Sequence, residues 1–85
     1  MMTIKQLTHK IITFCNNYID NDNIIFGITK YPTYIAIEFD IWALNDEKYI
    51  STHIGLISKY IHNENEFNDF KNKVINELPE LLKRI

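Results

Sequence analysis

The sequence predicts an α+β fold: a three-stranded antiparallel sheet with two helices packed on one face, in the order α-β-β-β-α. Two observations predict it. Apolar residues recur at helical spacing in the first and last segments, and they alternate with polar residues in segments between them. Because 85 residues suffice for one core but not for two, we expect residues 1–85 to form a single domain.

The first helix is predicted from about Ile4 to Ile19. Thr3 and Gln6 suit a capping box, in which each side chain satisfies a free backbone N–H of the first turn. The Asn and Asp run at residues 20–23 ends the helix, because these side chains favour turns by bonding their own backbone. A short strand rich in β-branched residues, Ile24 to Thr29, follows.

A long strand is predicted from Tyr34 to Ala43, where apolar and polar residues alternate with period two. After a polar turn at 45–48, the alternation resumes from Tyr49 to about Ile57, with Ile54 and Leu56 on the apolar side. Residues 58–62 fit either an extension of this strand past a bulge at Gly55 or a short helical turn. The residues of the long strand expected to face the helices are Ile35, Ile37, Phe39 and Ile41.

The last helix is predicted from about Glu64 to the C-terminus, with Asn63 as its N-cap. Pro79 interrupts it, but the apolar stripe keeps its phase across this residue, which predicts a kink and not a break. Lys83 and Arg84 are expected in the last turn, where positive charge complements the helix dipole.

Composition excludes several function classes. Nine scattered basic residues against eleven acidic ones, a net charge of −2, disfavour direct nucleic-acid binding, which needs clustered lysines and arginines. The single cysteine, Cys15, cannot form an intrachain disulfide, and its place on the apolar stripe predicts burial. Two glycines cannot build a phosphate-binding loop. We therefore expect no cofactor and no metal.

Localisation follows from the apolar pattern. The N-terminal segment has periodic apolar residues in place of the continuous apolar core of a signal peptide, and no stretch approaches the roughly 20 apolar residues of a membrane span. We expect a cytoplasmic protein. Heavy use of Ile, Asn and Lys is typical of AT-rich coding DNA, as in low-GC bacteria, their phages and mobile elements.

One face of the sheet is predicted to stay open, because each helix has a single apolar stripe and both must cover the same side. Clustered tyrosine and tryptophan are typical of protein-binding surfaces, whereas a flat strand offers two carboxylates no pocket for catalysis. The alternative is a solvated face whose aromatics cover the sheet edges. The predicted partner-binding residues are Tyr34, Glu38, Asp40, Trp42, Tyr49 and His53, with Asp46 and Glu47 in the adjoining turn.

The element order resembles that of the double-stranded-RNA-binding domain. That family grips phosphates with lysines at the start of its last helix, whereas the last helix here begins Asn63-Glu64-Asn65-Glu66. The hairpin turn at 45–48 also lacks the Pro and His of the family's minor-groove loop. A nucleic-acid-binding regulator of this plan is one alternative function.

Size, acidity, layout and coding bias over the whole chain are similar to those of small phage inhibitors of bacterial defence, the anti-CRISPR proteins. The resemblance implies a non-enzymatic inhibitor that binds a larger protein or nucleoprotein complex with a basic surface. A toxin-neutralising immunity protein and a homodimer whose open faces pair remain alternatives. The acidic candidates for such contacts are Glu38, Asp40, Asp46, Glu47, Glu64, Glu66 and Asp69.

Overall fold

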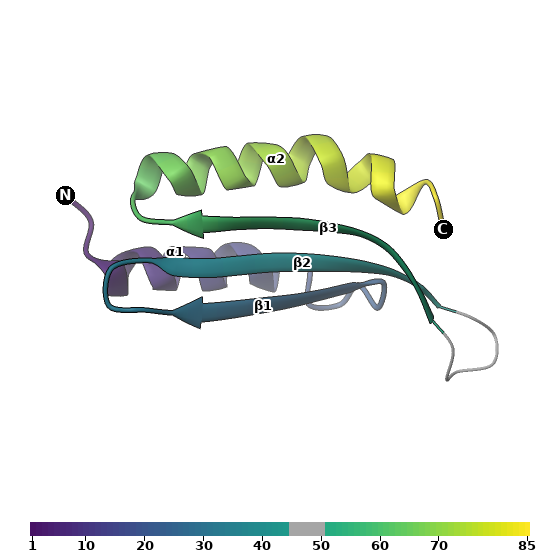
Figure 1. The fold of residues 1–85 in the computed structure, drawn as a ribbon, viewed down its shortest axis with the longest axis horizontal. Coiled ribbons are helices and arrows are strands. Elements are labelled where there is room, and N and C mark those ends of the chain that lie inside the picture. Colours follow the sequence, from purple (N-terminus) through teal and green to yellow (C-terminus); the bar gives the residue numbers. More distant parts are fainter. Residues whose placement is uncertain (45–50) are drawn as a thin grey trace.

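The computed structural model describes residues 1–44 and 51–85 and shows an α+β fold with the predicted order of elements (Figure 1). Neither helix of this described part is long and apolar enough to cross a membrane. The elements are α1 (Ile4–Asn16), β1 (Ile24–Lys30), β2 (Ile35–Leu44), β3 (Ser51–Ile61) and α2 (Glu64–Leu82).

Helix α1 begins as predicted and ends earlier. The Thr3 side chain accepts a hydrogen bond from the Gln6 amide (3.1 Å), and the Gln6 side chain accepts one from the Thr3 amide (3.0 Å), which confirms the capping box. After Asn16 the chain continues in turns instead of reaching Ile19 as a helix. Tyr18 nevertheless packs its ring 5.3 Å from that of Phe39 in the core.

Helix α2 continues across Pro79, which confirms that this residue does not end the helix. Its N-cap is Asn63, whose side-chain oxygen accepts a hydrogen bond from the Glu66 amide at 2.9 Å. The prediction that Lys83 and Arg84 lie in the last turn was wrong. Lys83 is the C-cap, since its amide donates to the Pro79 carbonyl (3.2 Å) and the helix ends one residue before it.

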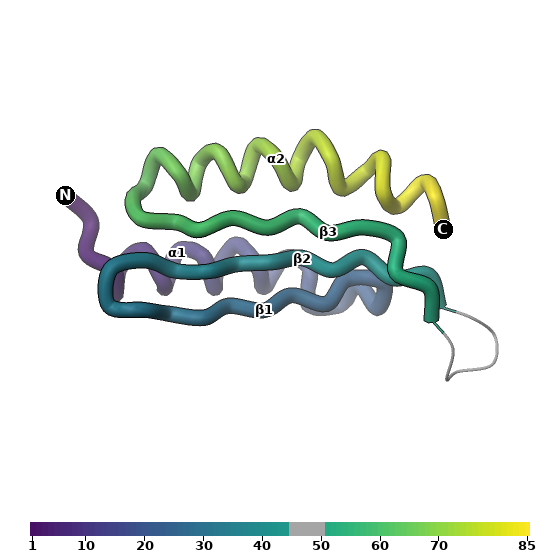
Figure 2. The backbone as a smooth tube through the Cα atoms, in the orientation of Figure 1, coloured from purple at the N-terminus to yellow at the C-terminus, as the bar shows by residue number. Residues whose placement is uncertain are grey.

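The three strands form one antiparallel sheet in the order β1-β2-β3. Residues 58–61 belong to β3, so the strand extension was the correct alternative for this segment. Figure 2 shows β2 between its two neighbours, with α1 behind the sheet and α2 running alongside β3.

The core lies between the sheet and the two helices. Phe14 of α1 packs edge-on against Phe67 and Phe70 of α2, with ring centroids 6.0 and 6.3 Å apart, so the helices meet over the same face of the sheet. Both helices and all three strands contribute to one buried cluster, and no described polar side chain is buried with it. The core residues from β2 are Ile35, Ile37, Phe39 and Ile41, each at most 2 % exposed.

Candidate partner-binding face

The candidate site is the face of the sheet that the helices leave uncovered, which we call the open face. Glu38, Asp40 and Trp42 lie on it, because the residues that alternate with them along β2 are buried against the helices. The predicted orientation of the long strand is thereby confirmed. Cross-strand partners share a face, and the open-face rows are Ile25–Asp40–Leu56, Gly27–Glu38–Ser58 and Thr29–Ala36–Tyr60.

A β-bulge in β3 changes which of its residues reach the open face. Ile41 pairs with Gly55 and the next residue, Trp42, pairs with His53, so Ile54 is the extra residue on β3. The sequence interpretation placed Leu56 on the helix side together with Ile54. That placement of Leu56 was wrong, because the bulge reverses the alternation and leaves this side chain 50 % exposed on the open face.

Gly55 takes the helix-side position opposite Ile41, directly under Leu81 of α2. A Cβ atom at Gly55 would lie 2.6 Å from Leu81 Cδ2, far inside van der Waals contact. The helix therefore approaches β3 closely at the bulge. The bulge and this contact together determine which β3 residues lie on the open face. The alternation of apolar residues in the sequence did not predict this arrangement.

The two predicted carboxylates of β2 have different surroundings. Asp40 Oδ1 lies 3.0 Å from Nε2 of His53, and the His53 ring lies 4.8 Å from the Trp42 ring. Two hydrogen bonds of 2.8 Å join Trp42 of β2 to Asn23. The Trp42 amide donates to the Asn23 carbonyl, and the Trp42 carbonyl accepts from the Asn23 side chain. Asp40, Trp42 and His53 thus form one connected group.

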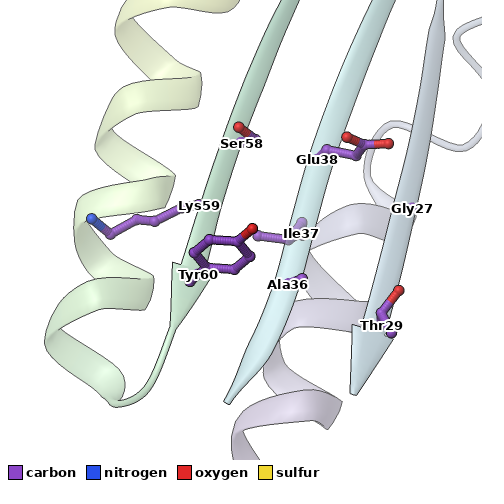
Figure 3. A pocket seen from close by; sticks show the side chains of 8 residues that line it. All are labelled: Gly27, Thr29, Ala36, Ile37, Glu38, Ser58, Lys59 and Tyr60. Atoms are coloured by element: carbon purple, nitrogen blue, oxygen red, sulfur yellow. The ribbon is translucent and has the colours of Figure 1, made fainter. Parts of the chain in front are cut away.

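Glu38 lies instead beside a hollow of about 360 Å³ in the open face, so the expectation that this face is flat and has no pocket was wrong. The ion pairs among the described residues do not involve Glu38. Figure 3 shows the Glu38 carboxylate on β2 and the Tyr60 ring on β3, with Lys59, which also lines the hollow, extending its side chain away from both toward α2. The hollow exists because the open-face positions around it carry small side chains, namely Gly27, Thr29, Ala36 and Ser58.

Aromatic side chains from three segments gather at one end of the open face. Tyr34 stacks on Tyr31 with 4.7 Å between ring centroids, meets Tyr60 edge-on at 5.7 Å, and lies 5.4 Å from the His62 ring. Tyr34 was a predicted site residue, whereas Tyr31 and Tyr60 were missed. Tyr60 falls in the segment left unassigned from the sequence, and its period-two spacing from Ser58 was the available signal.

The open face also carries exposed apolar side chains that sequence reasoning did not select. Their clustering on the same side as the aromatics comes from the cross-strand register. Large exposed apolar groups on one face mark interaction surfaces more often than isolated ones do. The members of this set are Ile25, Leu44, Leu56 and Tyr60, each at least 50 % exposed.

At the strand positions that the structure describes, the acidic and basic residues of the open face are both carboxylates, Glu38 and Asp40. Lys30 and Lys59, the lysines of β1 and β3, pair with buried residues of β2 and so belong to the helix side. The strand positions described on the open face therefore include the carboxylates of Glu38 and Asp40, the histidine His53, and no lysine or arginine. Tyr49, Asp46 and Glu47, also predicted site residues, lie outside the described residues.

The thiol of Cys15 and a metal site were the other chemical groups to consider. Cys15 is fully buried, and burial raises the pKa of its thiol to about 12, so it is a protonated core side chain at neutral pH, as the apolar stripe predicted. Within residues 1–44 and 51–85, no three His, Cys, Asp or Glu side chains are grouped closely enough to hold a metal ion.

Comparisons with protein-family models, curated proteins and solved structures found no match.

Proposed function

We propose that this chain is a protein-binding module that docks its open face onto a basic surface of a larger partner. The observation that carries the proposal is the composition of this face: two carboxylates, no lysine or arginine at its described strand positions, and exposed aromatic and aliphatic side chains around them. Opposite charges on the two facing surfaces raise the association rate, and aromatic side chains buried at the centre of an interface lower the dissociation rate.

The hollow beside Glu38 suits a cationic side chain of that partner. A carboxylate and an exposed tyrosine ring that line the same hollow match a guanidinium group, which pairs with carboxylates through two N–H donors and stacks on aromatic faces. Lysine offers the charge but not the planar surface. We therefore propose arginine as the anchor residue that enters the hollow.

The class of partner rests on charge. A nucleic-acid-binding groove of a bacterial defence complex, which the resemblance to anti-CRISPR proteins implies, is one basic surface of this kind. A toxin neutralised by an immunity protein is another. Both would meet the same acidic face, so the same substitutions test both.

The α-β-β-β-α order favours a second candidate, a nucleic-acid-binding regulator. Helix α2, however, carries Glu64 and Glu66 in its first turn, where negative charge opposes a phosphate. Gel shifts with double-stranded RNA at about 50 mM salt decide between the two, because phosphate-driven binding is strongest at low salt. A shift under these conditions would favour the second candidate.

A titration with a small cation tests the hollow without knowing the partner. Two-dimensional NMR of the ¹⁵N-labelled chain with N-acetyl-arginine amide is expected to give saturable shifts at Gly27, Glu38 and Ser58. The uncharged N-acetyl-citrulline amide should give none. Glu38→Gln should abolish the shifts, whereas Glu77→Gln, on the exposed surface of α2, should leave them unchanged. Equal shifts with both ligands, or in both variants, would remove the arginine site.

Pull-downs test the docking itself. With purified candidate partners, the variant carrying Glu38→Lys and Trp42→Ala is expected to bind at least tenfold more weakly than the parent. Glu77→Lys introduces the same charge change on α2 and should bind like the parent. If the double variant binds as well as the parent, and both the double variant and Glu77→Lys give the parent's circular dichroism spectrum, the open face is not the docking surface.

A further inference from the structure

Among residues 1–44 and 51–85, no strand pairs with the outer edge of β1, the edge that faces away from β2. The Trp42 amide bonds the Asn23 carbonyl and the Tyr31 amide bonds the Tyr34 carbonyl, both at 2.8 Å, at the two ends of the β1–β2 ladder. Hydrogen-bonded pairs alternate in an antiparallel ladder, and the register between these two bonds has no shift. The odd-numbered residues of β1 therefore bond β2, and the even-numbered ones point their backbone groups outward.

The outward groups form a continuous row from the Ile24 carbonyl to Lys30. The Ile24 amide is already bonded to the Asn21 carbonyl at 3.1 Å, which marks the start of the row. Proteins protect such edges with proline, bulges or inward-pointing charges. β1 has no proline, its ladder has no bulge, and its interior from Ile25 to Thr29 is uncharged. In Figure 2, β1 runs along the border of the sheet.

The charges at the two ends of β1 select the direction of an added strand. Asp20 and Asp22 precede β1, and Lys30 is its last residue. None of the ion pairs of residues 1–44 and 51–85 involves these three. A second β1 in antiparallel orientation brings each acidic end next to a lysine, whereas a parallel one brings like charges together.

We infer that β1 pairs antiparallel with β1 of a second copy of this chain, with the two-fold axis at Gly27. This register makes Phe26 and Ile28 of opposite copies hydrogen-bonded partners, so the outward amides of both are satisfied. Gly27 then faces its own copy in the narrow, non-hydrogen-bonded position, where Cα atoms lie about 4.5 Å apart and the absence of a side chain favours close approach.

Side-chain burial supports the same register. Phe26 and Ile28 point to the helix side, yet each is only partly buried in the single chain, because β1 is the border strand and makes few contacts with α1. Across the two-fold axis Phe26 of one copy packs beside Ile28 of the other. The interface thus combines about six backbone hydrogen bonds with two apolar pairs.

The dimer enlarges the open face. Two three-stranded sheets become one of six strands, and the two Glu38 residues lie three strand spacings apart, about 14 Å. The hollow beside each Glu38 is lined by Gly27, so both hollows adjoin the new junction. The pairing is independent of what the open face binds, since the edge groups and the open-face side chains point in different directions.

Analytical ultracentrifugation from 1 to 200 μM tests the inference. At the higher concentrations the parent is expected to have an apparent mass of about twice the 10.2 kDa of one chain. Lys30→Glu should weaken the dimer at least tenfold, and the swap Asp22→Lys with Lys30→Glu should restore it. Lys5→Glu, an exposed residue of α1 with the same charge change, should leave it intact.

Amide exchange supplies a second measurement. The amides of Phe26 and Ile28 are expected to exchange at least tenfold more slowly at 200 μM than in dilute protein, while those of Gly27 and Thr29 stay protected at both. A parent that is monomeric at 200 μM would overturn the inference. So would a dimer that survives Lys30→Glu but dissociates with Trp42→Ala, since its interface would then be the open face.

Discussion

Replacing Phe39 by alanine tests which face of β2 belongs to the core, on which the open face depends. Phe39 is fully buried in the centre of the sheet. Truncation leaves a cavity at the point where strands and helices meet. Its ring contacts, by centroid distance, are Tyr18 (5.3 Å), Phe70 (5.6 Å), Phe26 (5.7 Å) and Phe14 (6.2 Å).

The expected loss is a large part of the total free energy of unfolding. Phe→Ala in a core costs about 3–5 kcal/mol. At roughly 0.05–0.15 kcal/mol per residue, a chain of this length has a free energy of unfolding of about 4–13 kcal/mol. Glu38→Ala, one residue away on the opposite face, should change it by no more than about 0.5 kcal/mol.

Urea denaturation followed by far-ultraviolet circular dichroism measures both variants against the parent. If Phe39→Ala has no folded baseline, the milder Phe39→Leu gives a transition that can be fitted. The orientation of β2 would be refuted if Glu38→Ala destabilised the chain more than Phe39→Ala, or if Phe39→Ala lowered the free energy of unfolding by less than about 1 kcal/mol.

Three further outcomes are expected. Gly55→Ala should destabilise the chain by about 1–3 kcal/mol in urea denaturation, because the new methyl group overlaps Leu81. Since Leu81→Ala removes the overlapping atoms, the double variant should lose less than the sum of the two single losses; an additive effect would show that the two residues do not meet. Cys15 should resist Ellman's reagent at pH 8 until urea unfolds the chain, since its pKa is about 12; rapid labelling of the folded chain would contradict its burial. Hydrogen bonds from the His62 backbone and ring hold the pKa of Glu66 below its ordinary value of 4.5, so the stability that its carboxylate contributes is present above pH 4.5 and is lost as the pH falls through the lowered pKa. In the Glu66→Gln variant the melting temperature should depend less on pH in that range, and an unchanged dependence would exclude the contribution.

Local signals in the sequence predicted the elements well where one segment carries all the information. The capping box of Thr3 and Gln6 and the N-cap Asn63 involve residues three apart, so spacing alone identifies them. The long strand was equally clear, because ten alternating residues leave one choice of buried face. The end of α1 was misplaced, because Tyr18 and Ile19 keep the apolar spacing although the chain there forms turns.

The candidate site was predicted only in part. Glu38, Asp40 and Trp42 follow from the pattern of one strand, and the structure places them together on the open face. The sequence suggested a bulge at Gly55, whereas the extra residue is Ile54. Leu56 was assigned to the wrong side, because the position of the bulge depends on how β3 pairs with β2. The hollow likewise depends on three strands, since its small residues come from each of them.

By itself, the sequence determined the number, type and order of the elements and the buried face of β2, because capping and periodicity act over a few residues. Tertiary structure alone decided how β3 is shifted against β2, how closely Leu81 covers Gly55, and which tyrosines meet Tyr34. The physical reason is that pairing register and helix approach are set by contacts between distant segments, and those contacts decide which side chains remain exposed together.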